Sequence, residues 1–363
     1  MTFCTLFNIN YLDKGLALYD SLELVTTDFC LYVLAMDDKC YEVLCDIKRK
    51  KLVPIKLEDF ETEELVSVKK DRKLGEYFWT CSSWIISYIL DNYSPEYCTY
   101  LDADLFFYSD PSVIITEMKR KRASVQVISH HFIKLIEEET SRIVGKYCVE
   151  CNTFRNDRNG RMLLDIWKRQ VIEHCSLDGD GVYWGDQKYL DNWVDDYDFV
   201  IASDNIGAGV APWNISQYIF SFESKDNGQS ISVKRNSRKE KLLFYHFENI
   251  EYIDDHTVNA SLVLSWGINK HTINSIYIPY LEHLRSIKTF LSCEYGIDIL
   301  LKSHPGVNID NGNPKRLHFN FRNKIKRLLC LFSLKKGLLF SIKYRLTFQL
   351  PRLLYKKYSI IKF

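Results

Sequence analysis

Two aspartates one residue apart follow an apolar run in the first third of the chain. Asp102 and Asp104 come directly after residues 97–101 and are followed by a Leu-Phe-Phe run. Residues i and i+2 of an extended segment face the same side, so both carboxylates can approach one cation. Oxygen ligands of this kind suit Mg²⁺ or Mn²⁺, often shared with substrate phosphates. The pattern favours a divalent-metal site, with solvated loop carboxylates as the alternative.

A phosphoryl-transfer reaction of the dehalogenase type also uses D-x-D after an apolar strand. Phe106 stands where those hydrolases have a small or β-branched residue, and no convincing set of one lysine and two acidic residues follows. This second interpretation is therefore disfavoured.

Strand-like and helix-like segments alternate before and after the two aspartates. Apolar runs predict strands at 3–7, 30–35, 51–55, 97–101 and 125–128, and helical spacing predicts helices at 12–24, 41–50, 77–90 and 161–175. This alternation predicts βαβ units, hence an α/β fold with a mostly parallel sheet. Ligands bind at the carboxyl ends of such strands. The segments 8–10 and 102–104 both lie at such ends, which favours a shared site.

The second half of the chain gives fewer patterns. Residues 185–193 are typical of a loop entering a helix, 205–213 of a glycine-rich turn, and 241–246 of a strand that ends in His246. Residues 256–300 are expected to be helical, with a break at Pro279.

The charge is distributed unevenly, although the formal net charge is only +1. Residues 315–363 contain 14 Lys or Arg and no Asp or Glu, so the other 314 residues carry 34 basic and 47 acidic side chains. Hydrophobic content of 46% excludes a disordered chain. We therefore expect an acidic body with a basic C-terminal segment, and no nucleic-acid partner for the body.

The cysteines and the N-terminus indicate a reducing compartment. Eleven cysteines form no disulfide framework, and we interpret Cys148 and Cys151 as a structural thiol pair rather than a metal or redox site. The first residues lack a basic region followed by an apolar stretch, and no run of about 18 apolar residues occurs. A cytoplasmic protein without a transmembrane helix is expected.

Several of these segments together carry a resemblance. The chain resembles GT-A-fold glycosyltransferases that use nucleotide-diphosphate sugars, broadly the family-8 type, and is more specifically similar to bacterial envelope-polysaccharide transferase-like proteins. The resembling segments are 5–12, 77–81, 100–111, 129–132, 145–147, 154–157, 185–190, 207–214 and 244–247. D-x-D alone is unspecific, but its order with Gly-Asp-Gln-Lys-Tyr-Leu, Ala-Pro-Trp-Asn and the late histidine is specific.

The resemblance implies a Rossmann-like GT-A domain and assigns binding residues. In similar enzymes the first strand and its loop hold the base and ribose of the donor. The candidates here are Phe7, Asn8, Asn10 and Tyr11, with an ordinary β–α turn as the alternative. Both motif carboxylates and a late histidine bind the divalent ion, Mn²⁺ or Mg²⁺. That set maps onto Asp102, Asp104 and His246, with Ala103 beside the donor.

The reaction also needs groups beside the sugar. Asp186 and Gln187 are candidates at the anomeric centre, and an N-cap role is the alternative for Asp186. His130 contacts donor or acceptor unless it is only a loop residue, and Trp213 with Asn214 would form an acceptor platform unless the tryptophan is simply buried. The metal would neutralise the leaving phosphate, while the sugar passes through an oxocarbenium-like state.

The chain also departs from the family pattern. Asn249 stands where a glycine follows the late histidine, no Lys-Pro-Trp occurs, and residues 80–84 contain no basic side chain. In the closer group an asparagine occupies the position of Cys148. The contacts to the diphosphate are therefore left open, and retention of the anomeric configuration is expected by analogy only.

The basic segment 315–363 alternates basic clusters with Leu/Phe blocks, which is typical of an interfacial amphipathic helix. Each Lys or Arg near an anionic leaflet contributes ~1 kcal/mol. An RNA-binding tail and a helix packed on the acidic body are the alternatives. We expect a catalytic domain at 1–255, a helical extension at 256–314 and a membrane-associating tail at 315–363.

The resemblance, together with these patterns, implies a hexosyltransferase that moves a sugar from a nucleotide donor, most simply a UDP-sugar, to a cell-surface glycan or a lipid-linked acceptor such as lipopolysaccharide. It would act peripherally on the inner face of the cytoplasmic membrane. The rival from another class is a degenerate, non-catalytic fold that serves as a membrane- or RNA-bound module.

Overall fold

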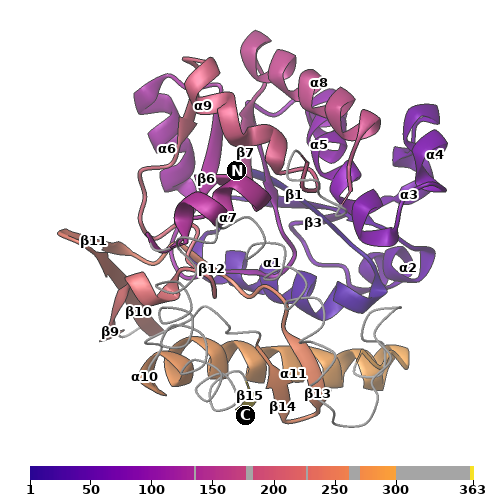
Figure 1. Cartoon of the computed structure of the whole chain (residues 1–363). Coiled ribbons are helices and arrows are strands. Elements are labelled where there is room, and N and C mark those ends of the chain that lie inside the picture. Colours follow the sequence, from indigo (N-terminus) through magenta and orange to yellow (C-terminus); the bar gives the residue numbers. More distant parts are fainter. Residues whose placement is uncertain (135, 177–182, 226–227, 261–269, 300–359) are drawn as a thin grey trace, which may run out of the picture.

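The computed structural model describes residues 1–134, 136–176, 183–225, 228–260, 270–299 and 360–363. A seven-stranded sheet in the order β3-β2-β1-β4-β7-β6-β8 forms its centre (Figure 1). The strands are β1 (Thr2–Phe7), β2 (Cys30–Ala35), β3 (Leu52–Lys56), β4 (Tyr97–Leu101), β6 (Val125–Ser129), β7 (Tyr147–Arg155) and β8 (Val200–Ala202). Only β7 runs antiparallel to its neighbours. The predicted α/β class with a mostly parallel sheet is confirmed.

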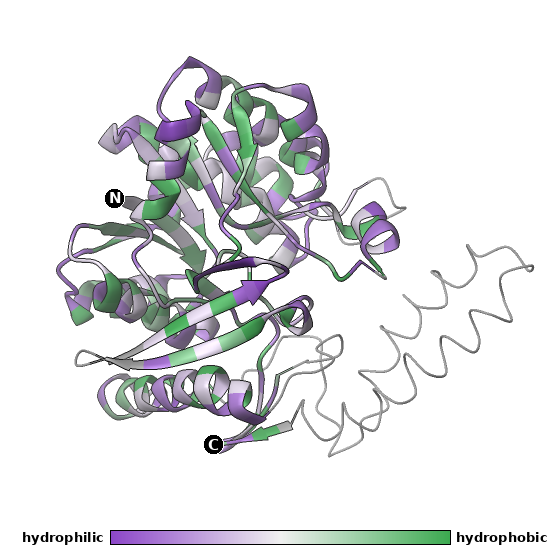
Figure 2. Cartoon of the chain, turned by 90° about the vertical axis from the view of Figure 1, so that its left-hand side faces the viewer, coloured by the Kyte–Doolittle hydropathy of each residue, from purple (hydrophilic) through white to green (hydrophobic). Residues whose placement is uncertain are grey.

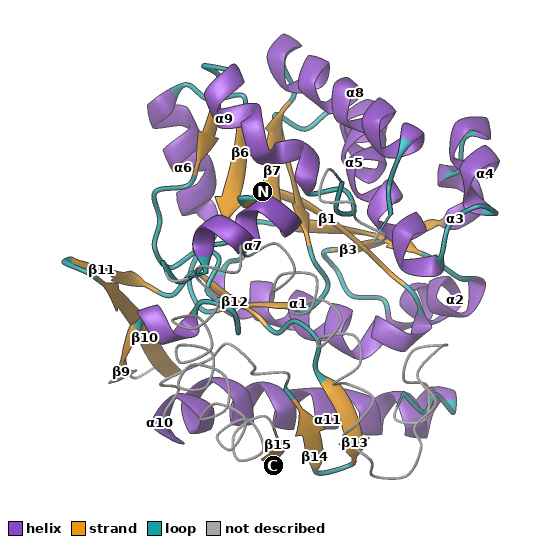
Figure 3. Cartoon of the chain, in the orientation of Figure 1, coloured by secondary structure: helices purple, strands orange, loops and turns teal. Residues whose placement is uncertain are grey.

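Helices cover both faces of this sheet (Figure 3). Side chains of a strand alternate between faces, so Phe3 and Phe7 of β1 enter one apolar cluster while Cys4 and Leu6 enter the other. The first cluster contains α1 (Leu12–Val25) and α2 (Asp38–Ile47), and the second contains α5 (Leu74–Tyr93) and α8 (Arg158–Glu173). Hydrophobic residues accordingly gather on the central strands in Figure 2.

Local capping explains where the predicted helices begin and end. α2 starts three residues before the predicted 41–50 because the side chain of Asp37 accepts a hydrogen bond from the Cys40 amide. It ends at Ile47 because Lys48 adopts a left-handed conformation (φ 50°). The shorter helices are α3 (Leu57–Phe60), α4 (Glu63–Lys69), α6 (Ser112–Lys121), α7 (Glu137–Val144) and α9 (Trp193–Asp196), with the single turns η1 (Ile9–Tyr11), η2 (Lys188–Asn192) and η3 (Ile215–Gln217).

Short antiparallel pairings lie beside the main sheet. β5 (Leu105–Phe107) pairs with β12 (Phe244–His246), so the predicted strand over 241–246 begins only at Phe244. The other strands are β9 (Ile219–Lys225), β10 (Gly228–Arg235) and β11 (Arg238–Lys241) in one sheet, and β13 (Glu251–Asp254), β14 (Thr257–Asn259) and β15 (Ile360–Lys362) in another. The hairpin of β13 and β14 crosses the domain boundary expected at residue 255.

The segment expected to be helical from residue 256 instead begins with strand β14. Helix follows in α10 (Lys270–Thr272), the π-helical turn η4 (Ile273–Tyr277) and α11 (Ile278–Tyr295). Pro279 does not end this described stretch: it lies in the first turn of α11, directly after the π-helical turn η4, so the helix changes from π to α geometry there and continues.

Most of the basic segment 315–363 lies outside the described residues. Its described end, residues 360–362, is strand β15 paired with β14 rather than part of a helix. In the described part of the chain, no helix combines the length and the apolar character needed to cross a bilayer.

Candidate metal and substrate site

Asp102, Asp104 and His246 converge at the end of β4. The pairing of β5 with β12 places His246 opposite Leu105, and the Phe247 amide donates to the Asp104 carbonyl (2.9 Å). His246 Nε2 lies 3.0 Å from Asp104 Oδ1 and 3.9 Å from Asp102 Oδ2. Ligand atoms of all three residues fall within 4.8 Å of one another. Strand pairing thus brings together side chains more than a hundred residues apart.

The two carboxylates meet through a turn rather than through the expected extended segment. The Leu105 amide donates to the Asp102 carbonyl (3.3 Å), which closes a tight turn around Ala103. The prediction that both aspartates face one point agrees with the geometry, but the physical reason given for it was wrong. Ala103 is buried in this turn and lines the cavity between the two acids.

Charge interactions dominate this cluster. Burial acts to raise the pKa of Asp104, but the charge and hydrogen bond of His246 outweigh it and hold that pKa below its ordinary value. Burial likewise opposes the charged form of His246, yet the Asp104 carboxylate raises its pKa well above 6.5. Withdrawal from water raises the pKa of Asp102. A proton on His246 thus supplies positive charge between the two aspartates.

Glu150 is a site residue that the sequence analysis missed. It is fully buried on β7, and His246 Nδ1 donates a hydrogen bond to its Oε2 (2.6 Å). Its backbone carbonyl accepts from the Asp102 amide (2.9 Å). The carboxylate therefore orients the imidazole so that Nε2 faces the two aspartates. The available signal was an acidic residue between the apolar residues Val149 and Cys151.

The donor set fits a divalent cation. Two carboxylates offer hard oxygen ligands, and one imidazole offers a borderline nitrogen. This set suits Mn²⁺; it also suits Mg²⁺, which has less preference for the nitrogen. A second cluster joins Cys148 to Glu150 and His246, but burial raises the pKa of the Cys148 thiol, so it stays protonated. Cys148 and Cys151 are both free and buried, as expected for structural thiols, and Cys151 packs in the larger apolar cluster.

The loop after β1 borders the same cavity. Asn8 caps η1 by accepting from the Asn10 amide (3.2 Å), and this turn presents Asn10 and Tyr11 to the cavity. Phe7 also lines it, although its ring is buried against Gly15, where an added Cβ would lie 2.2 Å from the ring. Lys14, one turn further along α1, is a lining residue that the sequence analysis did not identify.

His130 and Trp213 form a second wall. The backbone carbonyl of His130 accepts from Trp213 Nε1 and from Asn214 Nδ2, both at 2.8 Å. The Trp213 ring packs edge-on against His246, with centroids 5.4 Å apart, and burial lowers the pKa of His130 to about 3, so its imidazole is neutral. Asn214 was expected at the acceptor platform, but it is fully buried, with its side chain bonded to backbone groups, and does not line the cavity.

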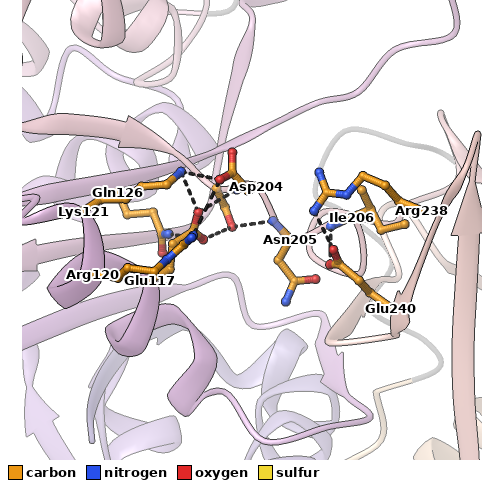
Figure 4. Close-up of polar contacts among 10 residues, drawn as sticks. Glu117, Arg120, Lys121, Gln126, Asp204, Asn205, Ile206, Arg238 and Glu240 are labelled. Carbon is orange, nitrogen blue, oxygen red and sulfur yellow. Dashed lines mark hydrogen bonds and ion pairs between the residues drawn. The ribbon is translucent and has the colours of Figure 1, made fainter.

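A polar network anchors the segment that carries Trp213 (Figure 4). The buried carboxylate of Glu117 on α6 accepts from Gln126 Nε2, Ser203 Oγ and the Asp204 amide, each at 2.9 Å. Further along, Glu240 accepts from the Ile206 amide (2.9 Å). These bonds fix the start of the glycine-rich turn against α6 and β11.

Asp186 and Gln187 lie on the same cavity. Ser82 Oγ on α5 donates to Asp186 Oδ2 (2.6 Å), and Trp167 Nε1 on α8 donates to the Asp186 carbonyl (2.9 Å). The N-cap of η2 is Gln187, so the capping alternative for Asp186 is wrong. Asp186 is 4% exposed, and burial raises its pKa to about 7. Gln187 Nε2 donates to the Val144 carbonyl (2.6 Å), which ties the segment to the end of α7.

One cavity of about 830 Å³ therefore collects nearly every residue that the sequence singled out. Its lining includes Phe7, Asn8, Asn10, Tyr11, Asp102, Ala103, Asp104, His130, Asp186, Gln187, Trp213 and His246. It thus joins an acidic, histidine-containing cluster to polar and aromatic walls. Such a cavity can hold a polar ligand of considerable size beside a bound cation.

Comparison with known proteins gives relatives of unassigned activity. No family model matches the chain. The uncharacterized protein YfnD of Bacillus subtilis is 28% identical over 289 residues, covering 78% of this chain and 88% of the relative. Among solved structures, mouse xyloside xylosyltransferase 1 is similar with a TM-score of 0.39 and 14% identity, covering 56% of this chain and 86% of that one. The uncharacterized Bacillus subtilis protein YfnF is 31% identical over 256 residues, covering 69% of this chain and 82% of the relative. The chain belongs to the family of YfnF.

Proposed function

We propose that the chain is a metal-dependent glycosyltransferase that moves a sugar from a nucleotide-diphosphate donor to an acceptor hydroxyl. The observation that carries the proposal is the cluster of Asp102, Asp104 and His246 in the cavity that Asn8 and Asp186 also line. A nucleotide sugar has a diphosphate that needs cationic partners and a sugar that needs polar contacts. The arrangement of the cavity provides a place for each.

Asp102, Asp104 and His246 would hold Mn²⁺ or Mg²⁺. When bound, such an ion stabilises the negative charge that develops on the leaving diphosphate. Glu150 keeps the His246 ring in the orientation that points Nε2 toward the two aspartates. Trp213 closes the side of His246 by packing against its ring.

Asp186 would act at the sugar. Its buried carboxylate, held by Ser82, has a pKa of about 7, so it is half ionised at neutral pH and mostly ionised above it. An ionised carboxylate stabilises the positive charge that builds on the anomeric carbon in an oxocarbenium-like transition state. The neutral imidazole of His130 can exchange hydrogen bonds with sugar hydroxyl groups. By the family resemblance, we infer retention of the anomeric configuration.

The donor is inferred from the family resemblance, and the acceptor from the charge of the C-terminal segment. A UDP-sugar donor follows from the resemblance to family-8-type enzymes. The 14 basic residues of segment 315–363 favour an anionic membrane surface, hence a glycan or lipid-linked acceptor at the inner face of the cytoplasmic membrane. Flotation with vesicles containing phosphatidylglycerol tests this part. Deletion of 315–359 should abolish flotation, and unchanged flotation would refute the membrane role.

A thermal-shift screen tests the activity class. Full-length protein is heated with UDP-, GDP- and CDP-sugars, with and without Mn²⁺, beside the variant Asp104→Asn. We expect one nucleotide class to raise the Tm only when Mn²⁺ is present, and the variant to lose this response, because a ligand stabilises only the state that binds it. Absence of stabilisation by every donor would instead favour the non-catalytic module.

A further inference from the structure

A buried lysine lies in the same cavity as the acidic cluster. Lys14, in the first turn of α1, is 5% exposed and lines the cavity together with Asp104 and Tyr11. Its ammonium group stands over the Tyr11 ring, 3.8 Å from the centroid, and 6.0 Å from the centroid of the Tyr252 ring. Aromatic faces thus hold this cation in place at the cavity wall.

No acidic group of the described residues forms an ion pair with this ammonium. Asp13 Oδ2 accepts from the Tyr252 hydroxyl while its Oδ1 has no hydrogen-bond partner, and Asp104 pairs with His246 Nε2 at 3.0 Å. Burial works against the charged form of Lys14, but Tyr11, Asp13 and Asp104 outweigh it and raise its pKa. The side chain is therefore a buried, charged ammonium that lacks an ion-pair partner among the described residues, and an anionic ligand would stabilise it.

The other lysine that lines the cavity, within the described ranges, is in a different situation. Lys73 has a side chain that is 67% exposed, and its Nζ lies 3.6 Å from Glu76 Oε1. Lys14 is thus the buried cation best placed to receive an anionic part of a ligand.

We propose that Lys14 binds the diphosphate of the nucleotide donor and supplies positive charge to it. The inference rests on the proposed function. A diphosphate beside Asp102 and Asp104 would have cationic charge on two sides, from the bound metal and from Lys14. The lysine ammonium is a compact point charge. It can bind phosphate oxygens from several directions, whereas arginine requires the fixed geometry of its two-pronged guanidinium.

Lys288 on α11 provides a matched control. It is also buried and also packs on Tyr252, with Nζ 3.7 Å from the ring centroid, but it does not line the cavity. Lys288→Met therefore removes a buried cation from the same aromatic ring without replacing a residue that lines the cavity.

The test compares affinities by calorimetric titration of the full chain with Mn²⁺ present. The probes are UDP, GDP and CDP. The affinity for the matching nucleoside is measured by its competition with each diphosphate. For the diphosphate that the wild type binds, Lys14→Met should raise Kd about 10- to 100-fold, the loss of one charged hydrogen bond. Affinity for the matching nucleoside should change less than about 3-fold, because the lost contact is to phosphate. Lys14→Arg should recover part of the loss, and Lys288→Met should bind like the wild type.

Three outcomes overturn the inference in distinguishable ways. Equal diphosphate affinity in wild type and Lys14→Met refutes the role of Lys14 while leaving the proposed function intact. An equal loss for nucleoside and diphosphate shows that the lysine only shapes the cavity, and Lys14→Gln repeats this comparison if the methionine variant does not fold. Failure of the wild type to bind any of the three diphosphates refutes the proposed function, and this inference with it.

Discussion

Substituting Asp186 by asparagine should make the folded protein more stable, by an amount that grows with pH. The carboxyl group is buried, and its pKa is about 7 instead of the ordinary 3.8. Between these two values the unfolded chain has released a proton that the folded chain still holds. Rising pH therefore favours the unfolded state over this range, and the cost is complete above pH 7.

The size of the effect follows from the two pKa values. Each unit of difference corresponds to about 1.4 kcal/mol, so ionised Asp186 costs folding on the order of 4 kcal/mol at pH 8. At pH 5 the cost is only about 2 kcal/mol because the folded state is still protonated. The stability advantage of Asp186→Asn over the wild type should therefore grow by about 2–3 kcal/mol between pH 5 and pH 8.

Urea unfolding of both proteins at several pH values measures this difference. Any effect of the amide that does not depend on pH cancels between pH 5 and pH 8. Ser82→Ala is the control, because removing the hydroxyl that stabilises the ionised form should move the midpoint of the pH dependence upward. A stability difference that stays constant with pH would show that the carboxylate is not held at a raised pKa, and would remove the argument for its role at the sugar.

Three further substitutions probe the walls of the site. Glu150→Gln should weaken Mn²⁺ binding about 10- to 100-fold in a titration, because the amide orients His246 less firmly; unchanged affinity would exclude that role. Trp213→Phe removes the hydrogen bond to the His130 carbonyl and should cost about 1 kcal/mol of unfolding free energy, and a neutral result in urea melts would argue against the bond. Gly207→Ala places a Cβ 2.0 Å from a backbone oxygen of the neighbouring strand and should lower stability by about 1–3 kcal/mol, which full wild-type stability would contradict.

The central sheet could be predicted from the sequence because its signals are local. Apolar runs at 3–7 and 30–35 match β1 and β2, and helical spacing finds α1. The strands from 219 to 241 gave no comparable signal, because they are largely polar and owe their order to pairing with one another. Pro279 misled for a related reason, since the helix changes from π to α geometry there instead of ending.

The candidate site was predictable only where residues carry a recognisable motif. Asp102 and Asp104 stand out by spacing, and His246 by the resemblance. Glu150 and Lys14 do not, because a charged residue in a strand or helix shows its role only when its neighbours are placed around it. Asn214 shows the opposite case. It belongs to a recognised motif and was predicted to bind a ligand, but its side-chain amide donates hydrogen bonds to backbone carbonyls behind the cavity.

The pairing of β15 with β14 changes what the basic segment can do. The chain leaves the described body after Ile299, which lines the cavity, and returns to it at strand β15. The C-terminal end of the basic segment is therefore fixed to the same body that carries the cavity. A partner that binds these last residues would be held beside that body instead of at a free chain end.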